Sequence, residues 1–228
     1  MKNSLIIIKK QLKDTFKNKI VLIQFVLFPI LTLIFENAVK IDGMEDLFFV
    51  KLFSAIYMGM APLSATAAII SEEKEKNTLR VLIMANVRPW QYLLGVGFYV
   101  WVICMTGAAV MSTCIPKNDI PCYLLIMAIG FAISTLAGAC IGIYAKNQMT
   151  ATSLTMPVMI IFAFAPMLAM FNESIGKVAK FLYTEQLKRI MDSMTFSGLK
   201  TECIGVLAVN AALAVILFFI LFREKGLE

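Results

Sequence analysis

The sequence contains no histidine and is poor in charged residues. Without imidazole, the chain lacks the usual general base, a common metal ligand and the central member of serine or cysteine triads. The pair Glu72–Glu73 therefore does not indicate a membrane-embedded glutamate protease of the type that trims prenylated proteins, because such sites also need histidines. Charged residues make up 16% of the chain, against about 25% in an average soluble domain. Composition thus argues against these enzymes and against a soluble fold.

Motifs for nucleotide and metal binding are also missing. A phosphate-binding loop needs the pattern G-x-x-x-x-G-K-[ST]. The only Gly-Lys pair, Gly176–Lys177, has neither the earlier glycine nor the following hydroxyl. The five cysteines show no CxxC or other metal-ligand spacing. We therefore expect no cofactor, no metal site and no catalytic site, and the chain offers no soluble basic domain for nucleic acid.

Long apolar runs dominate the sequence, which is 60% hydrophobic. A bilayer core of about 30 Å requires about 20 residues of helix. Six runs reach this length, and they cover residues 20–38, 48–70, 92–114, 122–145, 153–171 and 203–222. We predict an all-α integral membrane protein in which residues 1–228 form one domain with six transmembrane helices.

The interior of the predicted spans carries almost no ionisable groups. The last four runs contain no Asp, Glu, Lys or Arg, and Glu36 and Lys51 lie near the ends of the first two. Ion-coupled transporters hold an ionisable residue within the membrane as the coupling site. The absence of a central carboxylate disfavours a proton- or sodium-driven antiporter.

Lysine and arginine are distributed unevenly between the segments that connect the runs. With the N-terminus inside, the inner segments hold thirteen of the 21 basic residues, and the short outer loops hold only Lys40, Lys117 and the border residue Lys51. Short cytoplasmic segments carry this excess in membrane proteins. We expect a multi-pass protein of the cell membrane with both termini in the cytoplasm.

Two segments outside the spans have helical periodicity. Residues 1–19 alternate an apolar stripe with lysines, which is typical of a helix lying at the lipid interface. Residues 172–202 are too long for a simple turn and predict short amphipathic helices at the outer surface. Cys114 and Cys122 flank a short outer loop and Cys203 begins the last span, so a disulfide at this face is sterically feasible.

The fourth run carries small residues at steps of four, namely Gly130, Ser134, Gly138 and Gly142. Such a stripe lets two helix backbones approach closely in lipid. The pattern predicts a helix-packing surface, either within the chain or between two copies, and we favour the contact within the chain.

Residues 71–91 form the only sizeable cytoplasmic loop. Asn77 and Thr78 are good N-cap types, and Pro89 marks a stop. Leu79, Leu82 and Ile83 give an apolar face at helical spacing. The loop therefore predicts a short helix over residues 78–87 that fits either on lipid or into a groove of a partner protein.

The stretch EKEKNTLRVLIMANV within this loop resembles the E-x-E-x-G-T-L-E-x-L-L-x-x-P motif of ABC-2 type permeases, the membrane subunits of one class of ATP-binding-cassette exporters. The matching residues are Glu73, Glu75, Thr78, Leu79 and Leu82. The sequence departs from the motif at Asn77, Arg80 and Asn86, where the family has glycine, an acidic residue and proline. The order of the predicted elements along the whole chain is also similar to that family.

The resemblance implies a function and partners. In that family the loop forms a coupling helix that docks into a cleft of the ATPase, which would give this role to Glu73, Glu75, Thr78, Leu79, Leu82 and the adjoining Ile83. It also implies a permease dimer, here of identical chains, embedded in lipid and bound to two ATPase subunits. The short length is similar to the subset that exports amphipathic peptides such as toxins or antimicrobials. Export of drugs or lipid-linked glycans, or a non-transport role as a membrane immunity protein, are the alternatives.

The missing phosphate-binding loop gives the first prediction: the purified chain should hydrolyse no ATP. Phosphate release is measured on a preparation that mass spectrometry shows to contain no other ATPase. Sustained hydrolysis by such a preparation would contradict the assignment of ATP use to a separate subunit.

Overall fold

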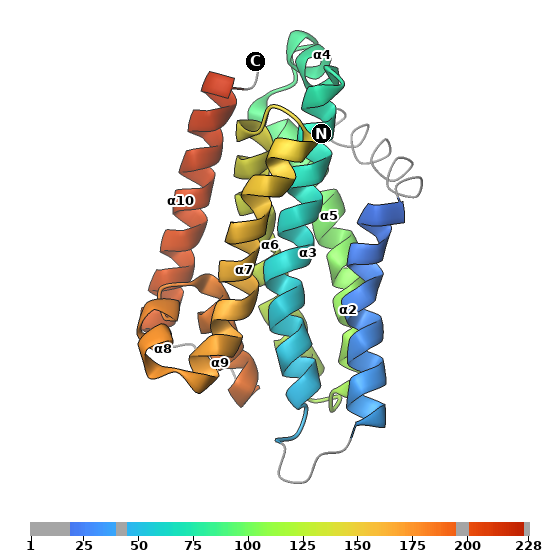
Figure 1. Cartoon of the computed structure of the whole chain (residues 1–228), viewed down its shortest axis with the longest axis vertical. Coiled ribbons are helices and arrows are strands. Elements are labelled where there is room, and N and C mark those ends of the chain that lie inside the picture. Colours follow the sequence, from blue (N-terminus) through green and yellow to red (C-terminus); the bar gives the residue numbers. More distant parts are fainter. Residues whose placement is uncertain (1–18, 40–44, 195–200, 226–228) are drawn as a thin grey trace.

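The computed structural model describes residues 19–39, 45–194 and 201–225, and these form a bundle of helices with no strand (Figure 1). The long helices are α2 (Lys19–Ala38), α3 (Phe48–Glu75), α5 (Pro89–Met111), α6 (Ile120–Tyr144), α7 (Gln148–Phe171) and α10 (Thr201–Lys225). Short elements connect them, namely α4 (Thr78–Met84), η1 (Ser112–Cys114), α8 (Glu173–Ala179) and α9 (Tyr183–Ser193). The interfacial helix expected over residues 1–19 lies outside the described part, except for its last residue.

Five of the described helices, α3, α5, α6, α7 and α10, are long and apolar enough to cross a membrane. They correspond to the second to sixth predicted runs, and the chain is a multi-pass membrane protein. In α2 the apolar stretch within the described residues is Ile23–Ala38, which is shorter than the spans above. The sixth span therefore stays a prediction.

Helix α3 lies at the centre of the bundle. Of the residues in its most apolar stretch 78% are buried, against 11% for α10 at the periphery. Figure 1 shows α4 and the C-terminal end of α10 at one end of the bundle, and α8 and α9 at the other. We call these the α4 end and the α9 end.

The small-residue stripe of α6 packs against α3 of the same chain. A Cβ added to Gly138 would overlap the carbonyl oxygen of Leu63, and one added to Gly142 would lie 2.7 Å from the Cβ of Ile70. At Gly130 the space is taken by the side chain of Met58. Small residues permit this approach of two backbones in lipid.

Ser134, the fourth member of the stripe, connects three elements by hydrogen bonds. Its hydroxyl donates to the carbonyl oxygen of Met58 on α3 and accepts from the phenol of Tyr183 on α9. Burial raises the pKa of Tyr183, so the phenol stays protonated and the contact involves no charge. Small size at position 134 thus also leaves room for α9.

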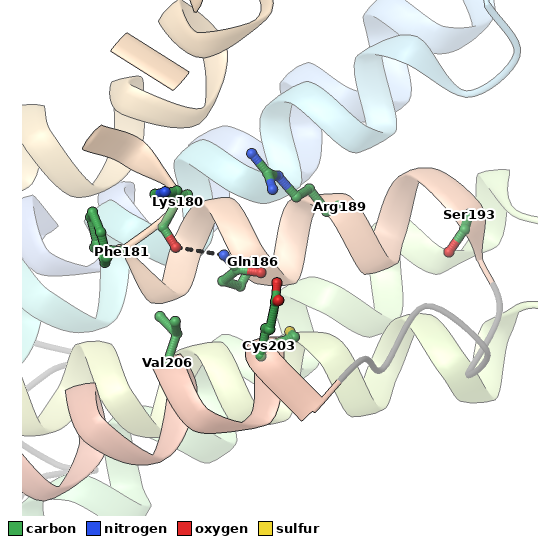
Figure 2. A pocket seen from close by; sticks show the side chains of 8 residues that line it. Lys180, Phe181, Gln186, Arg189, Ser193, Cys203 and Val206 are labelled. Atoms are coloured by element: carbon green, nitrogen blue, oxygen red, sulfur yellow. Dashed lines mark hydrogen bonds between the residues drawn. The ribbon is translucent and has the colours of Figure 1, made fainter. Parts of the chain in front are cut away.

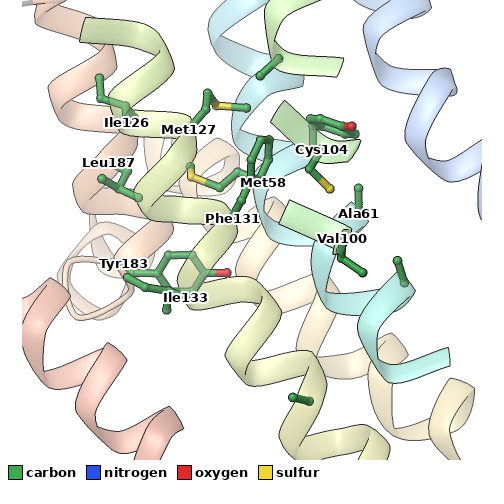
Figure 3. Close-up of a cluster of buried hydrophobic side chains, with 14 of the residues drawn as sticks. Met58, Ala61, Val100, Cys104, Ile126, Met127, Phe131, Ile133, Tyr183 and Leu187 are labelled. Carbon is green, nitrogen blue, oxygen red and sulfur yellow. The ribbon is translucent and has the colours of Figure 1, made fainter. Parts of the chain in front are cut away.

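Helix α9 inserts its apolar face into the end of the bundle. Figure 3 shows Tyr183 and Leu187 beside Met58 and Phe131, in a cluster that continues towards Cys104. The ring of Tyr57 on α3 meets that of Phe131 edge to face, with centroids 5.4 Å apart. Because Tyr183 and Leu187 belong to this cluster, the side chains of α9 help to fix the distance between α3 and α6.

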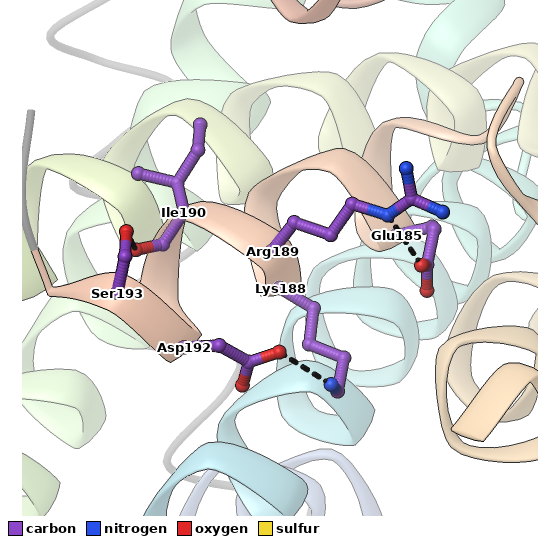
Figure 4. Close-up of polar contacts among 6 residues, drawn as sticks. All are labelled: Glu185, Lys188, Arg189, Ile190, Asp192 and Ser193. Carbon is purple, nitrogen blue, oxygen red and sulfur yellow. Dashed lines mark hydrogen bonds and ion pairs between the residues drawn. The ribbon is translucent and has the colours of Figure 1, made fainter. Parts of the chain in front are cut away.

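The polar face of α9 is held by two ion pairs along the helix (Figure 4). Arg189 Nε donates to Glu185 at 2.8 Å and Lys188 Nζ donates to Asp192 at 2.6 Å. Pairs at this spacing stabilise a helix by only about 0.2–0.5 kcal/mol each. The burial of Tyr183 and Leu187, rather than these pairs, keeps α9 in place.

The contact between α3 and α6 gives a prediction about stability. Gly138→Ala should lower the free energy of unfolding by about 1–3 kcal/mol, because the added methyl group meets backbone that has no side-chain freedom to move away. The measurement is the apparent melting temperature of the purified protein in detergent micelles.

Gly205→Ala is the matched control, because nothing lies within 4 Å of a Cβ added at this position of α10. Its melting temperature should not fall. Equal melting temperatures for the two variants would mean that α3 and α6 are not in backbone contact at Gly138.

Candidate functional site

The end of α3 is longer and more highly charged than the predicted span, which stops at residue 70. The helix continues to Glu75 and presents three consecutive ionisable residues, Glu73, Lys74 and Glu75, to three different helices. Glu73 is only 5% exposed, and its Oε2 accepts a hydrogen bond from the phenol of Tyr92 at 2.6 Å. Tyr92 lies in the first turn of α5, so this bond connects α3 to α5.

The next two residues contact the short turn between α6 and α7. Lys74 Nζ donates to the carbonyl oxygen of Ile143, in the last turn of α6, at 2.8 Å. Glu75 Oε2 accepts from the backbone N–H of Gln148, the first residue of α7, at 3.0 Å. We call Lys74, Glu75 and their two backbone partners the α3 clamp.

Glu72 belongs to a different contact. It forms an ion pair with Lys76 one turn further along the same chain, on the solvent side of α3. Such exposed pairs contribute little to stability. Lys76 directly follows α3, so this ion pair does not connect α3 to another helix.

Helix α4 is shorter than expected and is bounded differently. It ends at Met84, and Asn86 has a left-handed backbone with a φ of 61°, so the expected range 78–87 was too long. Asn77 is also left-handed, with a φ of 57°, and its side chain makes no capping hydrogen bond. Pro89 does not end α4 but stands in the first position of α5, where its missing N–H costs nothing.

The two faces of α4 have different surroundings. Leu79 is 1% exposed, and Leu82 and Ile83 pack against the same hydrophobic core that fills the bundle. Val81 and Met84 are 63% and 77% exposed and lie three residues apart, on one side of the helix. The α4 end thus consists of a short helix anchored by one apolar face and presenting a second one outward.

This arrangement, an apolar helical bundle with a short helix exposed at one end, was compared with known proteins. A family model described as ABC-2 family transporter protein matches residues 2–223. The chain belongs to the ABC-2 transporter family. Membership makes it a membrane component of an ABC transporter and implies association with ABC ATPase subunits. A comparison with curated proteins found no match.

The residues to which the resemblance gave a coupling role lie at the end of α3 and in α4 of the ABC-2 protein. Glu73 and Glu75 have partners within the chain, and Leu79 is enclosed by it. Thr78, Leu82 and Ile83 are partly buried around α4. Their contact with an ATPase stays a prediction.

Other residues at this end were missed at the level of sequence. Val81 and Met84 form an apolar pair at helical spacing, but the neighbouring Leu79, Leu82 and Ile83 form a second one, and periodicity alone does not tell which faces outward. The contact between the hydroxyl of Tyr92 and Glu73 was not predicted either. A pair of opposite charges in adjacent positions, Lys74 and Glu75, was the available signal for the α3 clamp.

The α9 end of the ABC-2 protein holds a hollow of 580 Å³ between α9 and α10 (Figure 2). Its lining mixes Lys180, Arg189 and Glu202, and Arg189 is already paired with Glu185. The mixture of charges selects no ligand of one sign. All five cysteines are free thiols, including Cys114, Cys122 and Cys203, for which the sequence left a disulfide open.

Proposed function

We propose that the protein is the transmembrane permease subunit of an ABC exporter, driven by two separate ATPase subunits. The observation that carries this proposal is the outward apolar face of α4 in a chain that belongs to the ABC-2 family. Val81 and Met84 together present a small, fixed apolar surface beyond the end of the bundle. An amphipathic helix of this kind fits a groove on a partner protein.

The expected coupling role is thereby divided between the two faces of α4. Leu79, Leu82 and Ile83 hold the helix on the permease, and Val81 and Met84 enter the groove of the ATPase. Arg80 is also exposed and lies between the buried and the outward face of α4, where it would meet the rim of that groove.

The proposed topology has six spans, with α2 as the first. Helix α2 contacts α3 and α5 along its length, and Ser64 on α3 donates to the side-chain oxygen of Gln24 at 2.9 Å. An amide inside a span finds a hydrogen-bond partner on a neighbouring helix, as observed here. Both termini and α4 then lie in the cytoplasm, in agreement with the distribution of lysine and arginine.

Helix α7 is the proposed wall of the translocation path, between two copies of the chain. Only 28% of its most apolar stretch is buried, and its exposed side carries hydroxyl groups, Thr152 and Ser153, among methionines. Met149, Met156 and Met170 are exposed to 81%, 52% and 47%. Methionine is flexible and adapts to varied apolar partners. Both hydroxyls donate to carbonyl oxygens one turn earlier in α7, Thr152 to that of Gln148 and Ser153 to that of Met149, so the methionines are the distinguishing feature of this side.

An amphipathic peptide suits this wall as the cargo. Helix α7 contains no charged residue, and its exposed methionines offer adaptable apolar contact. A naked polar sugar would find few partners here. Helices α2, α5 and α10 also expose large apolar side chains, and these would contact lipid.

The proposal predicts that Val81→Glu weakens association with the ATPase. Burying one valine-sized side chain contributes about 1.5–3 kcal/mol, so its loss lowers affinity by at least about tenfold. The measurement is recovery of the co-expressed ABC ATPase with the tagged permease, at matched membrane expression.

Val81→Ile is the matched control, because it keeps an apolar, branched side chain, and it should retain most of the binding. Leu79→Glu should act differently and lower the amount of folded permease, since Leu79 lies in the core. Undiminished recovery of the ATPase with Val81→Glu would show that this face is not the docking surface.

A further inference from the structure

We propose that Lys74 and Glu75 are positioning residues that carry the movement of α4 to α6 and α7, by way of the α3 clamp. This inference rests on the proposed function, in which the ATPase moves α4. Under this proposal Glu73 and Glu75, the acidic residues before α4, make contacts within the permease. The family resemblance, in contrast, implies that they contact the ATPase.

Each clamp residue occupies a place that the helix ends favour. The last four carbonyl groups of a helix have no partner within it, and the Ile143 carbonyl is one of them because α6 ends at Tyr144. The C-terminus of a helix also carries partial negative charge. The ammonium of Lys74, which is 9% exposed, satisfies both the hydrogen bond and the charge.

Glu75 acts at the opposite helix end. The first N–H groups of α7 lack partners within the helix, and the N-terminus carries partial positive charge. Asn147 caps one of these groups by accepting from Thr150 at 2.8 Å. The carboxylate of Glu75 accepts from another, that of Gln148. Lys74 therefore lies at the helix end with partial negative charge, and Glu75 lies at the end with partial positive charge. Exchanging the two residues would make both contacts unfavourable.

The clamp lies directly next to α4 in the chain. Only Lys76 and Asn77 separate Glu75 from the first residue of α4, and Leu79 fixes α4 to the core. A displacement of α4 therefore displaces the end of α3 with it. Helix α7 is the less enclosed of the two helices that the clamp reaches, and it contains Pro157 and Pro166. It is the one more able to respond.

The first part of the test uses the permease alone. Amide hydrogen exchange of residues 145–151 is measured on the purified full-length protein in lipid nanodiscs. Glu75→Ala and Lys74→Met should each speed exchange in this segment by up to about tenfold, since each removes a charge-assisted bond at a helix end. Glu72→Gln is the control, because the ion pair of Glu72 runs along the chain to Lys76, and it should leave the segment unchanged.

The second part uses the complex with the ABC ATPase that co-purifies with the wild-type protein. Trapping with ATP and vanadate should change exchange in both α4 and residues 145–151 of the wild type. In Glu75→Ala the change in α4 should remain and the change in residues 145–151 should be lost. A merely structural role would not separate these two responses.

The outcomes distinguish this inference from the proposed function. If no ATPase binds or α4 does not respond in the wild type, the proposed function fails, and the first part alone decides whether the clamp holds the turn. If Glu75→Ala and Lys74→Met leave exchange in residues 145–151 as in the wild type, the clamp is overturned. Retention of both nucleotide responses in Glu75→Ala would overturn its part in transmission.

Discussion

The backbone contact between α3 and α6 is the constraint on which the other helix positions depend. Gly138 and Gly142 allow α6 to lie against Leu63 and Ile70, so that no side chain separates the two helices. In a bilayer, where apolar side chains gain little from leaving lipid, such van der Waals contact is a main force between helices. With this pair fixed, α5 and α7 pack around α3, and α9 closes one end through Tyr183.

The charged side chains of the described chain gather at the two ends of this pair. At the α9 end two ion pairs run along α9 itself, and Glu36 at the end of α2 accepts from the backbone N–H of Val50 on α3. At the α4 end the charges of α3 reach other helices, because Glu73 binds Tyr92 and Lys74 and Glu75 bind the turn of α6 and α7. In the proposed mechanism, a force applied at the α4 end reaches α6 and α7 through hydrogen bonds to their backbone. This concentration of contacts between helices at the α4 end agrees with the proposal that the ATPase acts on this end of the permease.

Much of the fold followed from the sequence, because apolar runs of bilayer length and a stripe of small residues are properties of a single helix. The five assessed spans and the stripe from Gly130 to Gly142 are of this kind. The site was less predictable, since periodicity reveals the faces of α4 but not which of them the bundle covers. Leu79 and Val81 are equally apolar in the sequence, yet one is 1% and the other 63% exposed. The partners of Lys74 and Glu75 depend on a turn about 70 residues away.

The central claim is that the exposed face of α4 meets an ABC ATPase. Site-specific photo-crosslinking tests it most directly, with a benzophenone amino acid placed at Met84 and, in a separate protein, at Phe181 in the α9 end. Both side chains are exposed, so incorporation should not disturb the fold. After irradiation of whole cells, the account predicts an adduct between the permease and the ATPase from position 84 and none from position 181. An adduct from position 181 alone would place the ATPase at the opposite end and contradict the account.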